Sequence, residues 1–120
     1  MDEQQSVSLR ETDGIVIATV QRSELTSDVT DALLRQLTAS LDADRPARLI
    51  LDVSNVRFMD SVVLGALVVL LRRIKRGNGR LALAGLSGHA RKVLQVTGLE
   101  KIFETYGSAA EALDGLRSPA

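Results

Sequence analysis

The stretch that decides the fold is LILDVSNVRFMDSVVLGALVVLLRRIKR, residues 49 to 76. It contains two apolar runs, residues 49–53 and 62–71, with a polar turn and a loop between them. Because strands are short and helices reach ten residues or more, we expect a buried strand first and a helix second. The loop then places an acid and a hydroxyl, Asp60 and Ser61, at the start of that helix.

The composition is typical of one folded domain. A chain of 120 residues with 45% apolar and 25% charged residues is long enough to bury a core. We therefore expect a single domain over residues 1–120, with an ordered core of about residues 6–116. Aromatic residues are scarce, so Leu, Val, Ile and Ala must build that core.

Charge and cysteine content argue against several classes of function. The formal net charge is zero, so nothing global attracts nucleic acid or an anionic membrane. Without cysteine there are no disulfides, thiolate metal sites or cysteine nucleophiles. The first six residues are acidic and polar, which is unlike a signal peptide, and no apolar run is long enough to span a bilayer. We expect a cytoplasmic protein without membrane insertion.

The segments around the central stretch predict further strands and helices. An Asp-Gly turn at residues 13–14 indicates a hairpin, because glycine accepts the positive φ of a tight turn. The strand after the central helix should lie parallel to the strand before it, in a right-handed crossover. In chain order the other expected elements are strands at residues 7–9 and 15–20, a helix from about 26 to Asp42, a Gly-Asn-Gly turn with left-handed backbone at 77–79, a strand at 81–84, a helix at 87–96 ended by Gly98, an edge strand at 102–106, a helix at 109–116 and a loose tail from Arg117.

These elements predict an α/β domain. Its small mixed sheet combines the N-terminal hairpin with the parallel crossover, and about four helices pack mainly on one face. The other face of such a sheet would be poorly covered. It would then be available to a protein partner or to a second copy of the chain, in a weak homodimer.

The residues do not support an enzyme. The single histidine, His89, lies in a predicted surface helix without a second ligand for a metal ion. Asp52 and Asp60 lack the spacing of a known acid–base pair, and Asp52 suits the turn at residues 54–55 better. The glycines beside Asn78 follow a helix rather than a strand, unlike a phosphate loop. We predict no catalytic residue, no metal and no cofactor.

A basic cluster closes the central helix. Its members are Arg72, Arg73, Lys75, Arg76 and Arg80. Cations at a helix C-terminus interact favourably with the helix dipole, by about 0.3–1 kcal/mol each, which explains the cluster without a ligand. A direct nucleic-acid site would need more net charge or interleaved aromatic residues.

The start of the central helix has two interpretations. As N-cap residues, Asp60 and Ser61 would accept hydrogen bonds from first-turn amides. As a modification site, Ser61 would carry a phosphoryl group at the positive end of the helix. Its roughly two negative charges would repel an acidic or apolar partner. The residue types alone favour the N-cap.

One face of the central helix is expected to stay outside the core. At about 100° per residue, Val63, Leu67, Leu70, Leu71 and Ile74 cluster on the core side. Val62 and Val69 then point outward with Gly65, and they still do so if the core face shifts by one row. Two exposed valines above Ser61 indicate a contact surface.

The residues around Ser61 resemble the signature of a known family. The segment DVSNVRFMDS at residues 52–61, followed by Leu64-Gly65, resembles the STAS domain and, more narrowly, a bacterial anti-sigma factor antagonist. The resemblance covers nearly the whole chain, as far as VLQVTGL at residues 93–99. It implies a STAS-like fold.

The resemblance also implies a function in transcription regulation. Family members bind an anti-sigma factor that is also a serine kinase, and this releases a sigma factor. The kinase phosphorylates the Ser after the Asp, here Ser61, and the phosphorylated antagonist no longer binds. Together with the exposed helix face, the resemblance predicts partner contacts at Glu24, Thr26, Asp60, Ser61, Val62, Gly65 and Val69.

Departures from the family pattern leave other functions open. Val62 and Val63 replace the Ser or Thr and the Gly that usually follow the phosphorylated Ser, and Thr26 replaces an Asp. The alternative is a STAS scaffold module without a Ser61 switch, in a stress-signalling assembly or a transporter-associated complex. An enzyme or small-ligand binder is a third class, but no phosphate-binding motif supports it.

Overall fold

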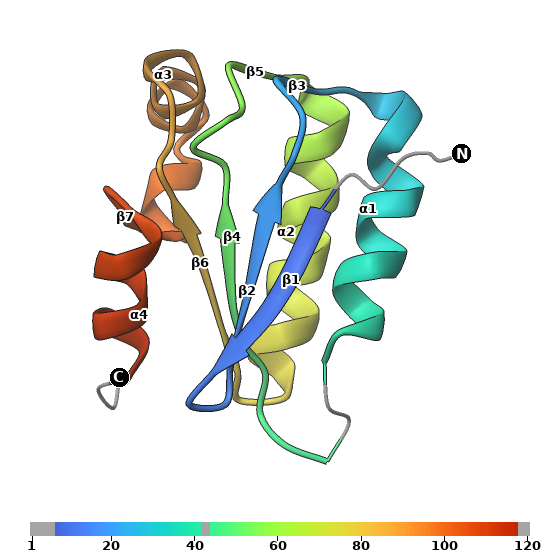
Figure 1. Ribbon diagram of the computed structural model, residues 1–120. Helices are drawn as coiled ribbons and strands as arrows, with labels where there is room; N and C mark the ends of the chain where they lie inside the picture. Colours follow the sequence, from blue (N-terminus) through green and yellow to red (C-terminus); the bar gives the residue numbers. More distant parts are fainter. Residues whose placement is uncertain (1–6, 42–43, 118–120) are drawn as a thin grey trace.

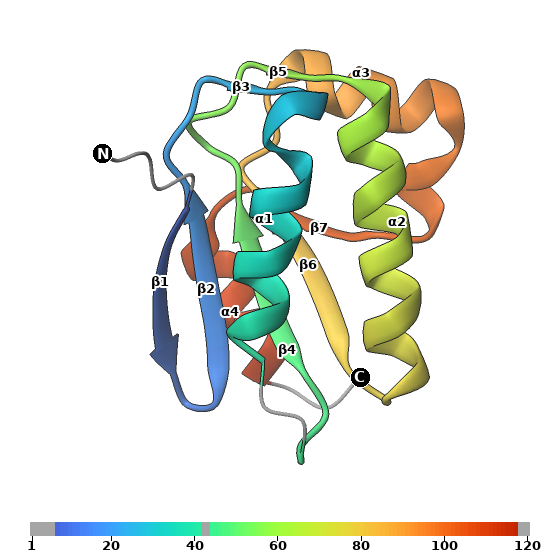
Figure 2. The same cartoon turned by 90° about the vertical axis from the view of Figure 1, so that its right-hand side faces the viewer.

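The computed structural model describes residues 7–41 and 44–117, which form a five-stranded mixed sheet with helices on both faces (Figures 1 and 2). The elements are β1 Val7–Thr12, β2 Ile15–Val20, β3 Glu24–Leu25, α1 Ser27–Ala39, β4 Arg48–Asp52, β5 Phe58–Met59, α2 Ser61–Arg76, β6 Arg80–Ala84, α3 Gly88–Thr97, the 3-10 helix η1 Leu99–Lys101, β7 Glu104–Tyr106 and α4 Ala109–Arg117. The strand order is β1-β2-β4-β6-β7, and only the β1–β2 pair is antiparallel. The predicted α/β fold with a mixed sheet is confirmed.

The hairpin forms for the reason that the sequence indicates. Asp13 and Gly14 have φ values of 55° and 78°, as a two-residue hairpin turn with two left-handed residues requires. Because the turn is so short, β1 continues to Thr12, directly opposite Ile15, rather than stopping after Leu9.

The main core lies between the sheet and the helices α1 and α2. The buried side chains of α2 are Val63, Leu64, Leu67, Leu70, Leu71 and Ile74, which confirms the predicted core face. They pack against inward-facing leucines of β4 and β6, Leu49, Leu51, Leu81 and Leu83. Burying each side chain of this size stabilises the fold by about 1.5–3 kcal/mol. The core therefore fixes the rotation of α2, and with it the residues that α2 exposes.

Two helix ends differ from the prediction. α1 ends at Ala39, where Ser40 becomes its C-cap and donates its hydroxyl to the Leu37 carbonyl at 2.6 Å. The loose tail was expected from Arg117, but Arg117 is the last residue of α4, and its guanidinium donates to the Asp13 carboxylate at 2.9 Å. The expected end near Asp42 and the rest of the tail lie outside the described residues. After α2, the predicted left-handed backbone of the Gly-Asn-Gly turn is confirmed at Asn78, with a φ of 64°. Asn tolerates this conformation because its short polar side chain can hydrogen-bond locally.

The second face of the sheet is covered, which corrects the expectation of a poorly covered face. α4 lies on the side of the sheet opposite to α2 (Figure 1). Its Ala112 and Leu116 pack against a second apolar cluster, formed by Ile15, Ile17, Ile50, Ala82 and Ala84. The short alanines of β6 allow this close approach. The centre of this face is therefore not available to a partner or to a second copy.

The last predicted segments form as expected, with an edge strand that is shorter, 104–106, than the expected 102–106. β7 pairs in parallel with β6 at the sheet edge. There the Arg80 guanidinium donates to the Glu104 carboxylate at 2.7 and 2.9 Å. This pair lowers the pKa of Glu104 and raises that of Arg80. Gly98, with a φ of 79°, ends α3 as predicted.

Replacing Gly79 with Ala should lower the free energy of unfolding by about 1–3 kcal/mol. A Cβ at this position would lie 2.4 Å from the carbonyl oxygen of Ala47, which is backbone and cannot rotate away. Urea denaturation would measure the loss. Gly88→Ala is the control, because no atom lies within 4 Å of a Cβ there. Equal losses in both variants would contradict the packing of this turn against the strand entry.

Candidate functional site

One carboxylate joins the N-termini of α1 and α2. Asp60 is the N-cap of α2, and its Oδ1 accepts a hydrogen bond from the Val63 amide at 3.0 Å. Its Oδ2 accepts from the amide of Ser27, the first residue of α1, at 2.8 Å. The predicted N-cap is confirmed for Asp60, which serves two helices rather than one, but not for Ser61, which is the first residue of α2 and accepts no such hydrogen bond from a described residue.

A two-stranded sheet that the sequence did not predict holds the two helix starts together. β3 and β5 pair in parallel, with Glu24 opposite Phe58 and Leu25 opposite Met59. The Asp60 amide then donates to the Leu25 carbonyl at 3.0 Å. Figure 2 shows α1 and α2 side by side, both starting at the end of the molecule where β3 and β5 lie. Strands of two residues are too short for the alternation that sequence patterns detect, so no signal could have found them.

Thr26 precedes α1 without capping it. Its side chain makes no capping hydrogen bond and instead donates its hydroxyl to the carboxylate of Asp28. This hydrogen bond lowers the pKa of Asp28. The first amide of α1 is bonded by Asp60 from a distant part of the chain. The positions of Thr26 and Asp60 are therefore linked through the start of α1.

Ser61 is exposed in the first turn of α2. Within the described chain its hydroxyl has no hydrogen-bond partner. The Asp60 carboxylate already bonds the Val63 amide, so a group attached to Ser61 would lie beside a negative charge. The hydroxyl is therefore exposed, and no hydrogen bond among the described residues depends on it.

The outer face of α2 continues from Ser61 as an exposed apolar surface. Val62 is 55% and Val69 is 54% exposed, and Gly65 between them is also exposed. We call Ser61, Val62, Gly65 and Val69 the α2 strip. The predicted outward direction of both valines is confirmed. A groove lined by Val69, Arg72, Lys75 and Arg76 extends the strip toward the C-terminus of the helix.

The structure brings most of the predicted contact residues to one end of the molecule. Glu24, Thr26, Asp60, Ser61 and Val62 lie on the paired short strands and at the adjacent helix starts. The other two, Gly65 and Val69, lie further along α2.

Sequence reasoning missed an aromatic contact near this end. Phe58 of β5 stacks on His89 of α3, with ring centroids 5.2 Å apart. His89 is exposed, as predicted for a surface helix, but one side of its ring is covered. The two rings come from distant segments, and no spacing in the sequence links them.

The described residues contain no group of His, Asp and Glu side chains that could hold a metal ion. Asp52 accepts a hydrogen bond from the Ser54 amide at 3.0 Å, as its predicted role in the turn requires. In the same described part of the chain, no helix is long and apolar enough to cross a membrane.

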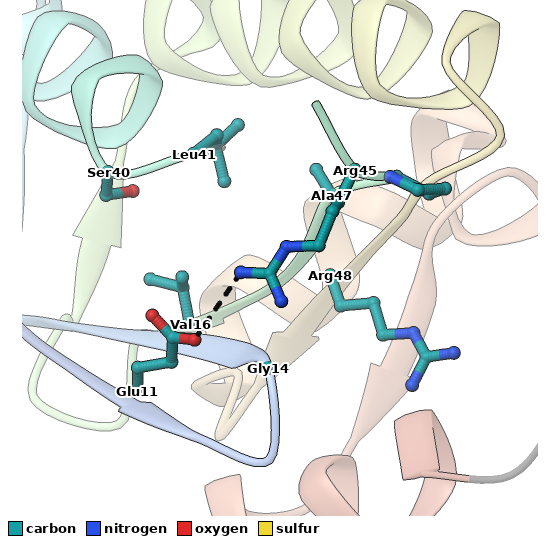
Figure 3. A pocket seen from close by; sticks show the side chains of 9 residues that line it. Glu11, Gly14, Val16, Ser40, Leu41, Arg45, Ala47 and Arg48 are labelled. Carbon is teal, nitrogen blue, oxygen red and sulfur yellow. Dashed lines mark ion pairs between the residues drawn. The ribbon is translucent and has the colours of Figure 1, made fainter. Parts of the chain in front are cut away.

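A hollow at the opposite end of the molecule offers no catalytic arrangement. It lies between the hairpin turn and the segment before β4, and Figure 3 shows Arg45 directed toward Glu11 across it. The two charged groups are 3.9 Å apart and mostly exposed, so the ion pair contributes little stability. Ser40, which also lines the hollow, donates its hydroxyl to the Leu37 carbonyl of α1.

Comparison with known proteins gives a consistent result. A family model described as STAS domain matches residues 6–112. The anti-sigma F factor antagonist of Paenibacillus polymyxa is 25% identical over 103 residues, which are 86% of this chain and 87% of the relative. An anti-sigma-factor antagonist (STAS) domain protein from Planctomyces limnophilus superposes with a TM-score of 0.86 at 23% identity, over 93% of this chain and 98% of that one. The Bacillus cell fate determinant SpoIIAA in its phosphorylated form gives a TM-score of 0.70 at 24% identity, over 92% and 99% of the two chains.

Replacing Asp60 with Ala should cost about 2 kcal/mol or more of unfolding free energy, because a single N-cap contributes about 1 kcal/mol and this side chain serves two helices. Amide hydrogen exchange should accelerate at both Ser27 and Val63, which lose their acceptor. Ser87→Ala is the control, since Ser87 caps only α3 through the Ala90 amide. Unchanged exchange at Ser27 would show that α1 does not depend on Asp60.

Proposed function

The chain belongs to the STAS domain family, whose model matches residues 6–112, and from this we propose that it is an anti-sigma factor antagonist. It would bind an anti-sigma factor that is also a serine kinase, and so release a sigma factor in the cytoplasm. The observation that carries the proposal is the exposed Ser61 beside Asp60, with the apolar α2 strip directly after it. The name of the Paenibacillus polymyxa relative supports it.

The docking surface would be the α2 strip together with Glu24 and Thr26. Both faces of the sheet are occupied by helices, and the outer side of α2 exposes two valines, Val62 and Val69, on one helix row directly after Ser61. Covering Val62 and Val69 completely would contribute about 1–2 kcal/mol each. Asp60 and the β3–β5 pair hold this surface in place before binding, so little ordering would be needed.

Phosphorylation of Ser61 would prevent docking without unfolding the domain. A phosphoryl group adds about 1.5 to 2 negative charges, and burying them beside Asp60 against a partner would be costly. In the free protein the group stays in water at the positive end of α2, which favours it. The hydrogen bonds that cap both helices belong to Asp60, so they need not break.

The residues that depart from the family pattern differ in how much they can affect docking of a partner. Val63 is fully buried, so it belongs to the core and cannot touch a partner. Val62 is exposed and does change the docking surface. At the start of α1, the Asp28 carboxylate is bonded to Thr26, so a negative charge lies beside the position where many family members carry Asp. These departures are compatible with docking.

The chain itself would be non-catalytic, with the partner supplying the kinase activity. The alternative is a STAS scaffold without the Ser61 switch. It would share the α2 strip and differ only in the response to ATP.

The test is incubation with the anti-sigma factor serine kinase encoded nearest its gene, once with ADP and once with ATP. The proposal requires a complex with ADP and a phosphorylated, dissociated chain with ATP.

Val62→Glu should weaken capture of this kinase at least about tenfold, because a charge would replace an apolar contact. The melting temperature should hardly change, since the side chain is 55% exposed. Isothermal titration calorimetry and thermal denaturation provide the two readouts. Leu9→Glu on β1 is the control, because Leu9 is 46% exposed but far along the chain from the strip. Unfolding of Val62→Glu would mean that this valine belongs to the core.

Ser61→Asp should fold normally and lose the kinase, while Ser61→Ala should bind it and resist phosphorylation. At this exposed position Asp adds a negative charge, whereas Ala adds none and removes the hydroxyl that would accept the phosphate. Mass spectrometry after incubation with kinase and ATP locates the phosphate. Because Val62 replaces a small polar residue, the reaction is expected to be slow. Phosphate on Thr26 or Ser54, with Ser61 unmodified, would move the switch to another residue.

A further inference from the structure

The net charge of zero hides a separation of charge along the chain. Nine basic residues but only two acidic ones fall between Arg57 and Lys101, a net charge of +7. The rest of the chain carries the opposite charge, because the total is zero. This positive segment begins at β5 and includes α2 and α3. Long-range attraction of a partner depends on such local potentials more than on net charge.

The highest density of this charge lies on α2, directly after the α2 strip. Arg72 and Arg76 continue the row of Val62, Gly65 and Val69, because each step is three or four residues along the helix. Arg73 flanks the same row. All three arginines are exposed, and none of them forms an ion pair with another described residue. The groove beside Val69 is lined by Arg72 and Arg76, so the apolar and basic parts form one surface.

Hydrogen-bond capping of the helix does not use these arginines, although the helix dipole favours cations in the last turn, where Arg73 and Arg76 lie. The backbone already satisfies the end of α2, because the Ile74 carbonyl accepts from the amides of Gly77 and Gly79, and the Lys75 carbonyl accepts from that of Asn78. Lys75 has a separate role, since its charge helps to lower the pKa of Glu104 on β7. Arg72 and Arg76, four residues apart, repel each other in the free protein, and no hydrogen bond or ion pair with another described residue holds any of the three arginines.

We propose that the partner which docks on the α2 strip presents an acidic protein surface along α2. An apolar centre would cover Val62 and Val69, and carboxylates would face Arg72, Arg73 and Arg76. This inference rests on the proposed function and adds the chemistry of the partner. A nucleic acid fits the row less well, because the row contains valines and no aromatic residue, and the exposed ring of Phe58 on β5 is already stacked on His89.

If the partner is acidic, a phosphoryl group on Ser61 also weakens binding by electrostatic repulsion at a distance. Ser61 begins the row that Arg72 and Arg76 end. A phosphate there would oppose the attraction that the arginines exert on the same partner surface, in addition to the cost of burying it. Binding would then depend on attraction by the arginines, and its inhibition on repulsion by the phosphate, both along the same helix.

The test compares Arg72→Glu/Arg76→Glu with Arg10→Glu/Arg35→Glu, which has the same net charge. Arg10 and Arg35 are exposed on β1 and α1 and are not part of the row on α2. Surface plasmon resonance would measure binding to the anti-sigma factor serine kinase encoded nearest the gene, with ADP, at about 50 mM and about 500 mM NaCl. Circular dichroism would confirm that both variants fold.

The expected result is a loss of at least about tenfold in affinity for the first variant at low salt, mainly through slower association. The control should stay within about threefold of the wild-type chain, and the difference should shrink at high salt. Equal behaviour of both variants, with wild-type binding intact, would overturn the inference and leave the proposed function standing. No binding of the wild-type chain would overturn both. Binding of a DNA duplex that the first variant loses, while kinase binding is unchanged, would assign the row to nucleic acid.

Discussion

The arrangement of this domain depends on how it places two helix N-termini side by side. Each N-terminus carries a partial positive charge and unpaired amides, so two of them in contact would repel each other. The Asp60 carboxylate resolves this, because one oxygen bonds the Ser27 amide of α1 and the other bonds the Val63 amide of α2. The short β3–β5 pair brings the carboxylate to that position through its last backbone hydrogen bond, from Asp60 to Leu25. The Asp60 carboxylate is thus needed to hold the two helix starts together, whereas the next residue, Ser61, stays exposed.

The two adjacent helix N-termini set the electrostatic surroundings of a phosphoryl group at Ser61. An isolated helix start would offer one positive end, whereas here two converge on the same place. They would offset much of the repulsion between a phosphate and the Asp60 carboxylate. A modification that is tolerated in the free domain and costly in a complex has the properties of a binding switch. The tolerance comes from the backbone, so it does not depend on whether valine or a smaller residue follows Ser61.

The local patterns of the sequence predicted most of the fold and half of this site. The Asp-Gly turn, the apolar face of α2 and the cap at Asp60 are each set by neighbours within a few residues. The bond from Asp60 to Ser27 joins residues 33 positions apart, through strands of only two residues, and no periodicity reports it. The same reason explains the error about the second sheet face. The last helix was expected, but only its packing on Ile15, Ile17 and Ile50 shows which face it covers.

The position of Ser61 also coincides with a boundary of charge. Glu24 of β3 and Asp28 and Asp31 of α1 expose their carboxylates, whereas the outer row of α2 is apolar and then basic. Asp60 and Ser61 lie where these two surfaces meet. A partner that covers both would place its acidic surface along α2 and a part without negative charge against Glu24, so the boundary would set its register on α2. A phosphate on Ser61 would extend the acidic side onto the first turn of α2, onto the surface that the partner needs. A single modified hydroxyl could thereby control a much larger interface, because it lies where the sign of the potential changes.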